Sequence, residues 1–84
     1  MKKNGKGFTL VELMIVIGSK KSANTTHLAQ IVSPITTTIH IETKDDLKHY
    51  EALIEKVNVI GVTAGASTPD FIIKEVINKL EEGE

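Results

Sequence analysis

Three short apolar runs alternate with segments whose apolar residues recur at helical spacing, and this alternation is the strongest constraint on the fold. Residues 13–17 form a continuous apolar run rich in Ile and Val, as in a strand that is covered on both faces. Residues 36–41 and 57–63 supply a second and a third run rich in β-branched residues. The order β-α-β-α-β-α predicts a parallel sheet with right-handed crossovers, either as a small three-layer α/β sandwich or as a single-sided fragment of one.

The segment between the first two runs predicts a short helix with a single apolar stripe. The stripe has the spacing i, i+3, i+4 and i+7 and consists of Leu28, Ile31, Val32 and Ile35. Asn24 or Thr25 is expected to cap the start of this helix, and Pro34 is expected to stop it.

Two further helices are predicted from spacing and capping signals. In the second, a variant of the capping box at Thr43 and Asp46 precedes apolar residues at helical spacing, which are Leu47, Tyr50, Ile54 and Val57. In the third, Pro69 stands at or near the first helical position, and the inner face consists of Ile73, Val76, Ile77 and Leu80.

Length and composition narrow the function classes. The chain has 84 residues, which is enough for one small domain, and it contains no cysteine. Cysteine nucleophiles, thiolate zinc sites and cysteine-ligated iron–sulfur clusters are therefore excluded for this chain. All 10 cationic residues are lysines, so the chain lacks the forked donors that dominate base recognition, and a nucleic-acid partner is not expected.

Two predicted strand-to-helix loops have compositions that suit an anion. Residues 18–24 offer backbone amides, two serine hydroxyls, the Asn24 amide and two lysines just before a helix. Residues 61–68 offer small residues and the hydroxyls of Ser67 and Thr68 at another helix start. Ligands collect at the carboxyl edge of a parallel sheet, and helix N-termini favour phosphate. The same residues also cap helices and permit tight turns when nothing binds, so both interpretations stand at this point.

Other candidate sites are weaker. Neither loop has the spacing of a Walker A or GxGxxG motif, so ATP and dinucleotides are not favoured. The spacing of His27, His40 and His49 does not resemble a metal site, and a structural or solvated role is expected for each. No arrangement of serine, histidine and aspartate can be inferred from the sequence.

The N-terminal stretch has the form of a targeting signal. Three lysines among the first six residues precede Gly7 and an apolar run that begins at Phe8. Glu12 is the one acidic residue in this run. Residues 1–17 resemble the leader of type IV prepilins, and this resemblance implies cleavage between Gly7 and Phe8. The run from Phe8 to Ile17 would measure about 15 Å as a helix and cannot span a bilayer core of about 30 Å. Residues 1–13 are therefore expected to form a leader or extension, and residues 14–84 a single α/β lobe; contact with a membrane is expected only if the leader functions.

Most of the chain resembles a second family. Residues 14 to about 80 are similar to the C-terminal lobe of 4-hydroxy-3-methylbut-2-enyl diphosphate reductase, an iron–sulfur enzyme of isoprenoid biosynthesis. Residues 14–25, 40–43 and 61–70 carry this resemblance. The resemblance implies that Ser22, Asn24 and Ser67 bind the substrate diphosphate. Ala23 stands where many members have a second serine, which implies the loss of one hydroxyl contact.

The family's full enzyme has three related lobes around a cluster held by three cysteines. This chain has none of those cysteines, so the resemblance implies a cytoplasmic fragment with no cofactor of its own, which binds a diphosphate-bearing small molecule but does not turn it over alone. Companion lobes or self-association would complete the site. The alternative hypothesis is a pilin-like structural subunit of the inner membrane or pilus with a borrowed globular part, produced by fusion, recombination or truncation.

Overall fold

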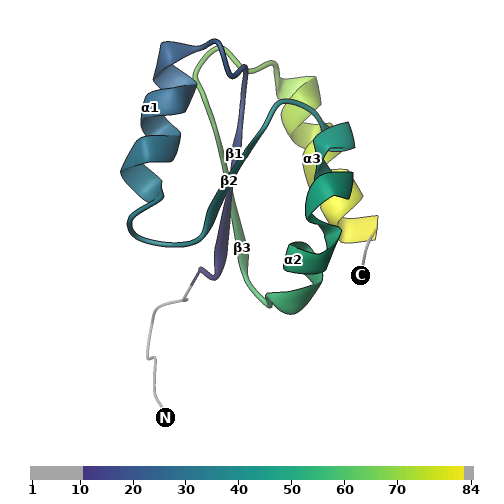
Figure 1. Ribbon diagram of the computed structural model, residues 1–84. Coiled ribbons are helices and arrows are strands. Elements are labelled where there is room, and N and C mark those ends of the chain that lie inside the picture. Colours follow the sequence, from purple (N-terminus) through teal and green to yellow (C-terminus); the bar gives the residue numbers. More distant parts are fainter. Residues whose placement is uncertain (1–10, 83–84) are drawn as a thin grey trace, which may run out of the picture.

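Three parallel strands form the sheet at the centre of the molecule (Figure 1). The computed structural model describes residues 11–82. The strands are β1 (Leu13–Ile17), β2 (Thr38–Ile41) and β3 (Ile60–Ala64), in the spatial order β2-β1-β3. At the end of β1, Ile17 pairs with Ile41 on one side and with Ala64 on the other. All three strands therefore end at the same edge of the sheet.

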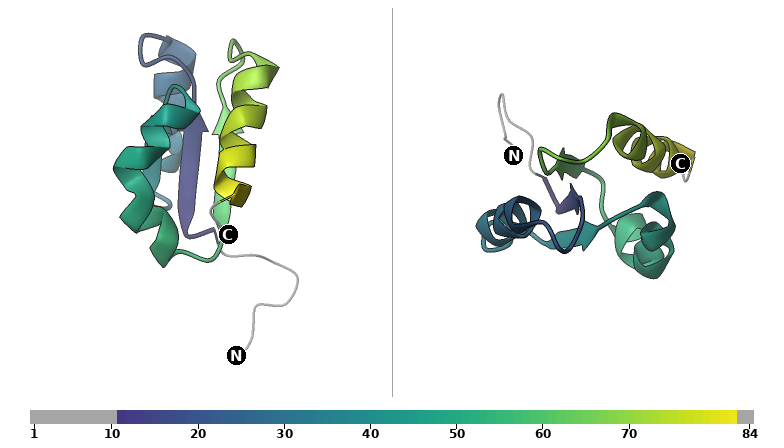
Figure 2. Two further views of the ribbon diagram at one scale, coloured as in Figure 1. Left: turned by 90° about the vertical axis from the view of Figure 1, so that its right-hand side faces the viewer. Right: turned by 90° about the horizontal axis from the view of Figure 1, so that it is seen from above.

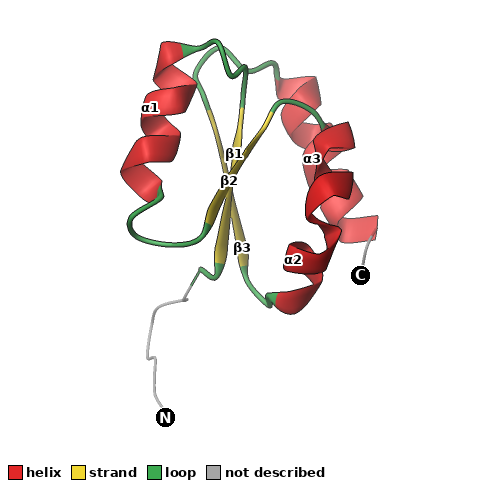
Figure 3. Ribbon diagram, in the orientation of Figure 1, coloured by secondary structure: helices red, strands yellow, loops and turns green. Residues whose placement is uncertain are grey.

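Helices cover both faces of this sheet, as Figures 2 and 3 show. The helix α1 (Ala23–Val32) lies on one face. The 3-10 helix η2 (Lys44–Tyr50) and the helices α2 (Glu51–Lys56) and α3 (Asp70–Glu82) lie on the other. The predicted β-α-β-α-β-α order is confirmed, and of the two predicted architectures the structure has the three-layer sandwich.

The core is centred on β1. Leu13, Ile15 and Ile17 are fully buried on the face covered by α3, and Val16 is fully buried on the opposite face. The core cluster also contains buried side chains from β2, η2 and α3, namely Ile39, Ile41, Leu47 and Val76. Burial on both faces of β1 confirms the prediction made from its continuous apolar run.

The helix α1 differs from its prediction at both ends. Its N-cap is Ser22, whose hydroxyl oxygen accepts a hydrogen bond from Thr25 N at 3.3 Å, so the prediction of Asn24 or Thr25 as the cap was wrong. Pro34 lacks the N–H that would continue the helix, which ends at Val32. Ile35 therefore lies beyond the helix and is 79% exposed, and Ile31 is 53% exposed. These two residues do not belong to a buried stripe.

The second predicted helix is divided into η2 and α2. The division falls at Tyr50, whose φ of -125° and ψ of 17° depart from helical values. The Asp46 carboxylate accepts hydrogen bonds from Glu42 N at 2.8 Å and Thr43 N at 3.4 Å, as expected from the acidic half of the capping box.

The strands β2 and β3 begin later than predicted because β1 sets their starting points. Met14 pairs with Thr38, and Leu13 pairs with Ile60. Residues before these positions have no paired residue on β1, so residues 36–37 and 57–59 lead into the strands instead of belonging to them.

Gly7 and Phe8, the predicted leader cleavage site, lie outside the described residues. Glu12, which the leader prediction singled out, uses its carboxylate to accept a hydrogen bond from Asn58 N. Within residues 11–82, no helix is both long enough and apolar enough to cross a membrane.

Candidate functional site

The loops after β1 and β3 meet at the carboxyl edge of the sheet, at the top of Figure 1. Both are fixed to the ends of strands. Gly18 N donates to Ile41 O at 2.9 Å, and Gly65 N donates to Ile17 O at 3.0 Å. The hydroxyl of Thr68 also donates to Ile17 O, at 3.0 Å. The two loops lie at one edge, as expected for a parallel sheet, and they are in direct contact there.

Thr25 lies where the two loops meet. A Cβ atom added to Gly65 would lie 2.0 Å from Thr25 Oγ1, and one added to Gly18 would lie 2.5 Å from it. Gly18 also has a φ of 155°, a conformation that side chains rarely allow. Both glycines therefore let the loops close tightly around Thr25.

The N-terminus of α1 presents hydrogen-bond donors at this edge. Among the described residues, the backbone N–H groups of Ala23 and Asn24 have no acceptor, as is usual in a first helical turn. The oxygen of Ser22 already accepts from Thr25 N, which leaves its O–H free to donate. Asn24 is exposed, and the first turn of α1 contains no acidic residue. These groups suit an anion.

The loop before α3 offers fewer free hydrogen-bond donors to an anion than its sequence predicted. Ser67 is exposed, and within residues 11–82 its hydroxyl has no partner. Thr68, the second expected hydroxyl, is committed to Ile17 O. Asp70 adds a carboxylate to the first turn of α3, which disfavours an anion at that helix start. Of the two helix starts, that of α1 is therefore better suited to an anion, and Ser67 lies on the neighbouring loop.

The charges around this edge are mixed. Lys20 and Lys21 are exposed on the loop after β1, but the Glu42 carboxylate accepts a hydrogen bond from Lys20 N at 2.7 Å. The pKa of Asp46 is lowered from 3.8, mainly by the hydrogen bond from Glu42 N, with smaller contributions from Thr43 N and the charge of Lys20. Fixed hydrogen-bond donors, more than net charge, therefore favour an anion here.

His40 supports the loop after β1 from the neighbouring strand. Its Nε2 lies 2.9 Å from Gly18 O, and because a carbonyl oxygen only accepts, Nε2 is the donor. This contact gives His40 a structural role. Within residues 11–82, no cluster of three or more histidine, cysteine or acidic residues is placed to hold a metal ion.

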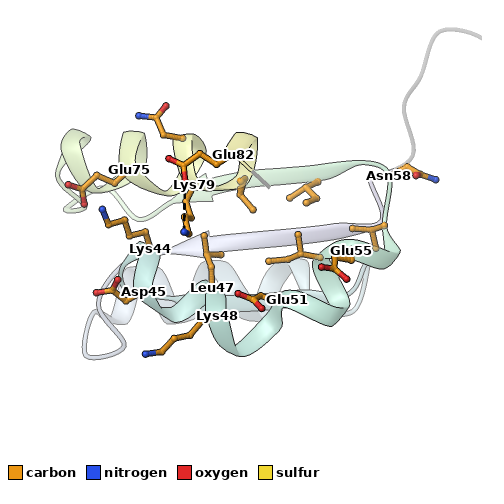
Figure 4. Close-up of a pocket in the computed structure, with 15 residues that line it drawn as sticks. Lys44, Asp45, Leu47, Lys48, Glu51, Glu55, Asn58, Glu75, Lys79 and Glu82 are labelled. Atoms are coloured by element: carbon orange, nitrogen blue, oxygen red, sulfur yellow. Dashed lines mark ion pairs between the residues drawn. The ribbon is translucent and has the colours of Figure 1, made fainter. Parts of the chain in front are cut away.

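A groove lies between α3 and the helices η2 and α2 (Figure 4). It has a volume of about 970 Å³, and Leu47, Ile54 and Leu80 contribute apolar side chains to its lining. Its charged residues have both signs, including the ion pair of Lys79 and Glu82 at 3.9 Å. None of the three predicted diphosphate ligands lines this groove, so it is separate from the candidate anion site.

Comparison with known proteins identifies similar sequences. Residues 4–81 match the family described as LytB protein. The 4-hydroxy-3-methylbut-2-enyl diphosphate reductase of Clostridium tetani is 55% identical over 71 residues, which cover 83% of this chain and 11% of the relative. The reductase of the same name from Pseudothermotoga lettingae is 44% identical over 71 residues, which cover 84% of this chain and 25% of the relative.

A solved structure has the same fold. The structure of (E)-4-hydroxy-3-methyl-but-2-enyl diphosphate reductase, the terminal enzyme of the non-mevalonate pathway, matches with a TM-score of 0.80 and 41% identity. The match covers 86% of this chain and 25% of that one. The chain thus spans 11% to 25% of the length of these three proteins.

Proposed function

Because the chain belongs to the LytB protein family, we propose that it is a diphosphate-binding lobe of the kind found in 4-hydroxy-3-methylbut-2-enyl diphosphate reductases. The lobe is the predicted unit of residues 14–84 together with Leu13, which begins β1 and is fully buried. Its ligand is a diphosphate-bearing small molecule of isoprenoid biosynthesis, and its location is the cytoplasm. The names of the relatives support the substrate class.

The free hydrogen-bond donors at the N-terminus of α1 are the main support for this proposal. This helix start combines two N–H groups that have no acceptor among the described residues with the free O–H of Ser22 and a first turn without acids. The Asn24 amide and the hydroxyl of Ser67 complete the set of donors. In this arrangement Ser22, Asn24 and Ser67 all donate to phosphate oxygens, and the α1 dipole favours the negative charge.

The residues of this chain do not fit the iron–sulfur cluster of the resembling enzymes. Thiolates are the usual ligands of such clusters, and the chain has no cysteine. We therefore assign binding of the diphosphate to this chain and no reductive step. Companion lobes or a second copy would cover exposed apolar side chains such as Ile31, Ile35 and Phe71, and sedimentation analysis of the chain would detect self-association.

Thermal unfolding with inorganic diphosphate tests the binding site. For a dissociation constant of about 1 mM, 10 mM diphosphate stabilises the folded chain by about 1.4 kcal/mol. This corresponds to a rise in midpoint of roughly 6–11 °C for a domain of this size. Equal concentrations of sulfate at matched ionic strength control for general salt effects. If diphosphate raises the midpoint no more than sulfate does, the proposal is wrong.

The variant Ser67→Ala separates binding from folding. Ser67 is exposed and, within residues 11–82, has no hydrogen-bond partner, so its removal should leave the midpoint of the free chain unchanged and reduce the shift caused by diphosphate. Ser33→Ala, an exposed serine at the opposite end of α1, is the matched control and should retain the full shift. An unchanged shift in Ser67→Ala would remove Ser67 from the site.

The motif around Gly7 and Phe8 favours a second candidate, a pilin-like structural subunit. In such a subunit the apolar helix would continue through residues 13–17, which here form β1. Co-expression with a prepilin peptidase, followed by intact mass measurement, tests this candidate. Loss of residues 1–7 with methylation of Phe8 would support it, and an untrimmed chain would exclude it.

A further inference from the structure

Thr25 holds a buried hydroxyl group without a partner. The residue is fully buried, and within the part of the chain that the structure describes, its Oγ1 makes no hydrogen bond. Leaving a buried hydroxyl unpaired costs free energy, and folded proteins pair most such groups. The unpaired hydroxyl of Thr25 therefore lowers the stability of the free chain.

This hydroxyl lies between the two loops of the proposed site. Its oxygen is directed at Gly18 in the loop after β1 and at Gly65 in the loop after β3. The backbone N–H of the same residue donates to Ser22 Oγ, so Thr25 also fixes the hydroxyl that we assign to diphosphate. One residue thus contacts both loops and a proposed ligand group.

A second threonine at this edge shows that the fold can pair such a group. Thr68, on the other loop, donates its hydroxyl to Ile17 O at 3.0 Å. The hydroxyl oxygens of both threonines lie near Gly18, yet of the two only that of Thr68 is paired within the described residues. Within residues 11–82, the Thr25 hydroxyl therefore contributes no hydrogen bond to the stability of the free chain.

We propose that Thr25 is a positioning residue whose hydroxyl gains its hydrogen bond only when diphosphate binds at the edge where the two loops meet. This inference rests on the proposed function. In the free chain the unpaired hydroxyl lowers stability, and in the bound form its pairing adds to affinity. Stability and affinity should therefore change in opposite directions when the hydroxyl is removed.

Four variants of the full chain test this coupling: Thr25→Val, Thr25→Ala, Thr25→Ser and Thr68→Val. The readouts are the unfolding midpoint of the free chain and the affinity for inorganic diphosphate by titration. Thr25→Val should raise the midpoint by about 4–8 °C, because the unpaired group is gone while the shape is kept. The same variant should bind diphosphate about tenfold more weakly, because one hydrogen bond is lost from the bound form.

The other variants distinguish this role from simple packing. Thr25→Ser keeps the hydroxyl and should bind diphosphate within about twofold of the unmodified chain. Thr25→Ala removes the hydroxyl without adding a methyl group and should lose affinity as Thr25→Val does, which covers the case in which valine does not fit. Thr68→Val removes a paired hydroxyl and should lower the midpoint of the free chain.

The outcomes separate this inference from the function on which it rests. If the unmodified chain binds diphosphate and both Thr25→Val and Thr25→Ala bind equally well, Thr25 has no role in binding and only this inference fails. A midpoint of the free chain that falls in both Thr25→Val and Thr25→Ala but is kept in Thr25→Ser would show that the hydroxyl is already paired, which also overturns the inference. If the unmodified chain does not bind diphosphate, the proposed function fails and this inference fails with it.

Discussion

The substitution Gly65→Ala should destabilise the chain through a single steric contact. Gly65 is buried, and among the described glycines only Gly18 has a positive φ, so Gly65 is not required for its backbone conformation. A methyl group there would lie 2.0 Å from Thr25 Oγ1, whereas the next nearest atoms, Thr25 Cβ and Cα, are 3.2 and 3.5 Å away. The expected effect therefore comes almost entirely from one oxygen atom.

The size of the effect follows from the cost of overpacking. An added methyl group that forces buried atoms apart costs about 1–3 kcal/mol. At 4–8 °C per kcal/mol for a domain of this size, the unfolding midpoint should fall by roughly 4–24 °C. In a Thr25→Ala background the oxygen is absent and the nearest of the three atoms, Thr25 Cβ at 3.2 Å, has to move by only a few tenths of an ångström, so the cost of Gly65→Ala should fall below about 1 kcal/mol.

Urea unfolding of the two single variants, the double variant and the unmodified chain measures this coupling directly. We expect a coupling energy of about 1–2 kcal/mol between the two positions. Thr25→Ser keeps Oγ1 and should give no relief, which makes it the matched control. The reasoning is refuted if Gly65→Ala costs less than about 0.5 kcal/mol, or if the cost is the same in both backgrounds.

Two further predictions concern stability. Asp46→Ala should cost about 1 kcal/mol at pH 7, because the carboxylate accepts two backbone hydrogen bonds. Folding lowers the pKa of Asp46 from 3.8, so the contribution of this carboxylate to stability is complete above pH 3.8 and is lost as the pH falls through the lower pKa of the folded chain. The urea midpoints of the variant and the unmodified chain should therefore converge in acid. Ile15→Ala should cost about 2–5 kcal/mol because the side chain is fully buried. Ile31→Ala, at an exposed position, should change stability by less than about 0.5 kcal/mol; equal effects of these two variants in urea unfolding would contradict the assignment of the core.

The layers of the fold could be predicted because they depend on local pattern. The run from Leu13 to Ile17 has no polar residue, and a strand of that kind must be covered on both faces. The starting points of β2 and β3 could not be predicted, because Thr38 and Ile60 are defined by their partners on β1. Ile35 illustrates the same limit, since its helical spacing was correct but the helix ended before it.

The edge that holds the candidate site could also be predicted, but its internal contacts could not. Parallel strands end together, which placed both loops at one edge. The bond from Thr68 to Ile17 O joins positions 51 residues apart, and no local pattern indicates it. Gly65 could be explained from sequence as a turn or a ligand contact, whereas the structure shows that it makes room for Thr25.

The strand order has a consequence for biosynthesis. Both β2 and β3 pair with β1 and not with each other, so the most apolar strand of the sheet is the first to leave the ribosome and the last to be fully paired. Until residues 60–64 have been synthesised, one side of the nascent LMIVI segment has no partner. Uncharged segments of this kind pair readily with copies of themselves. The yield of soluble chain should therefore depend on the rate of translation and on chaperones that shield this segment.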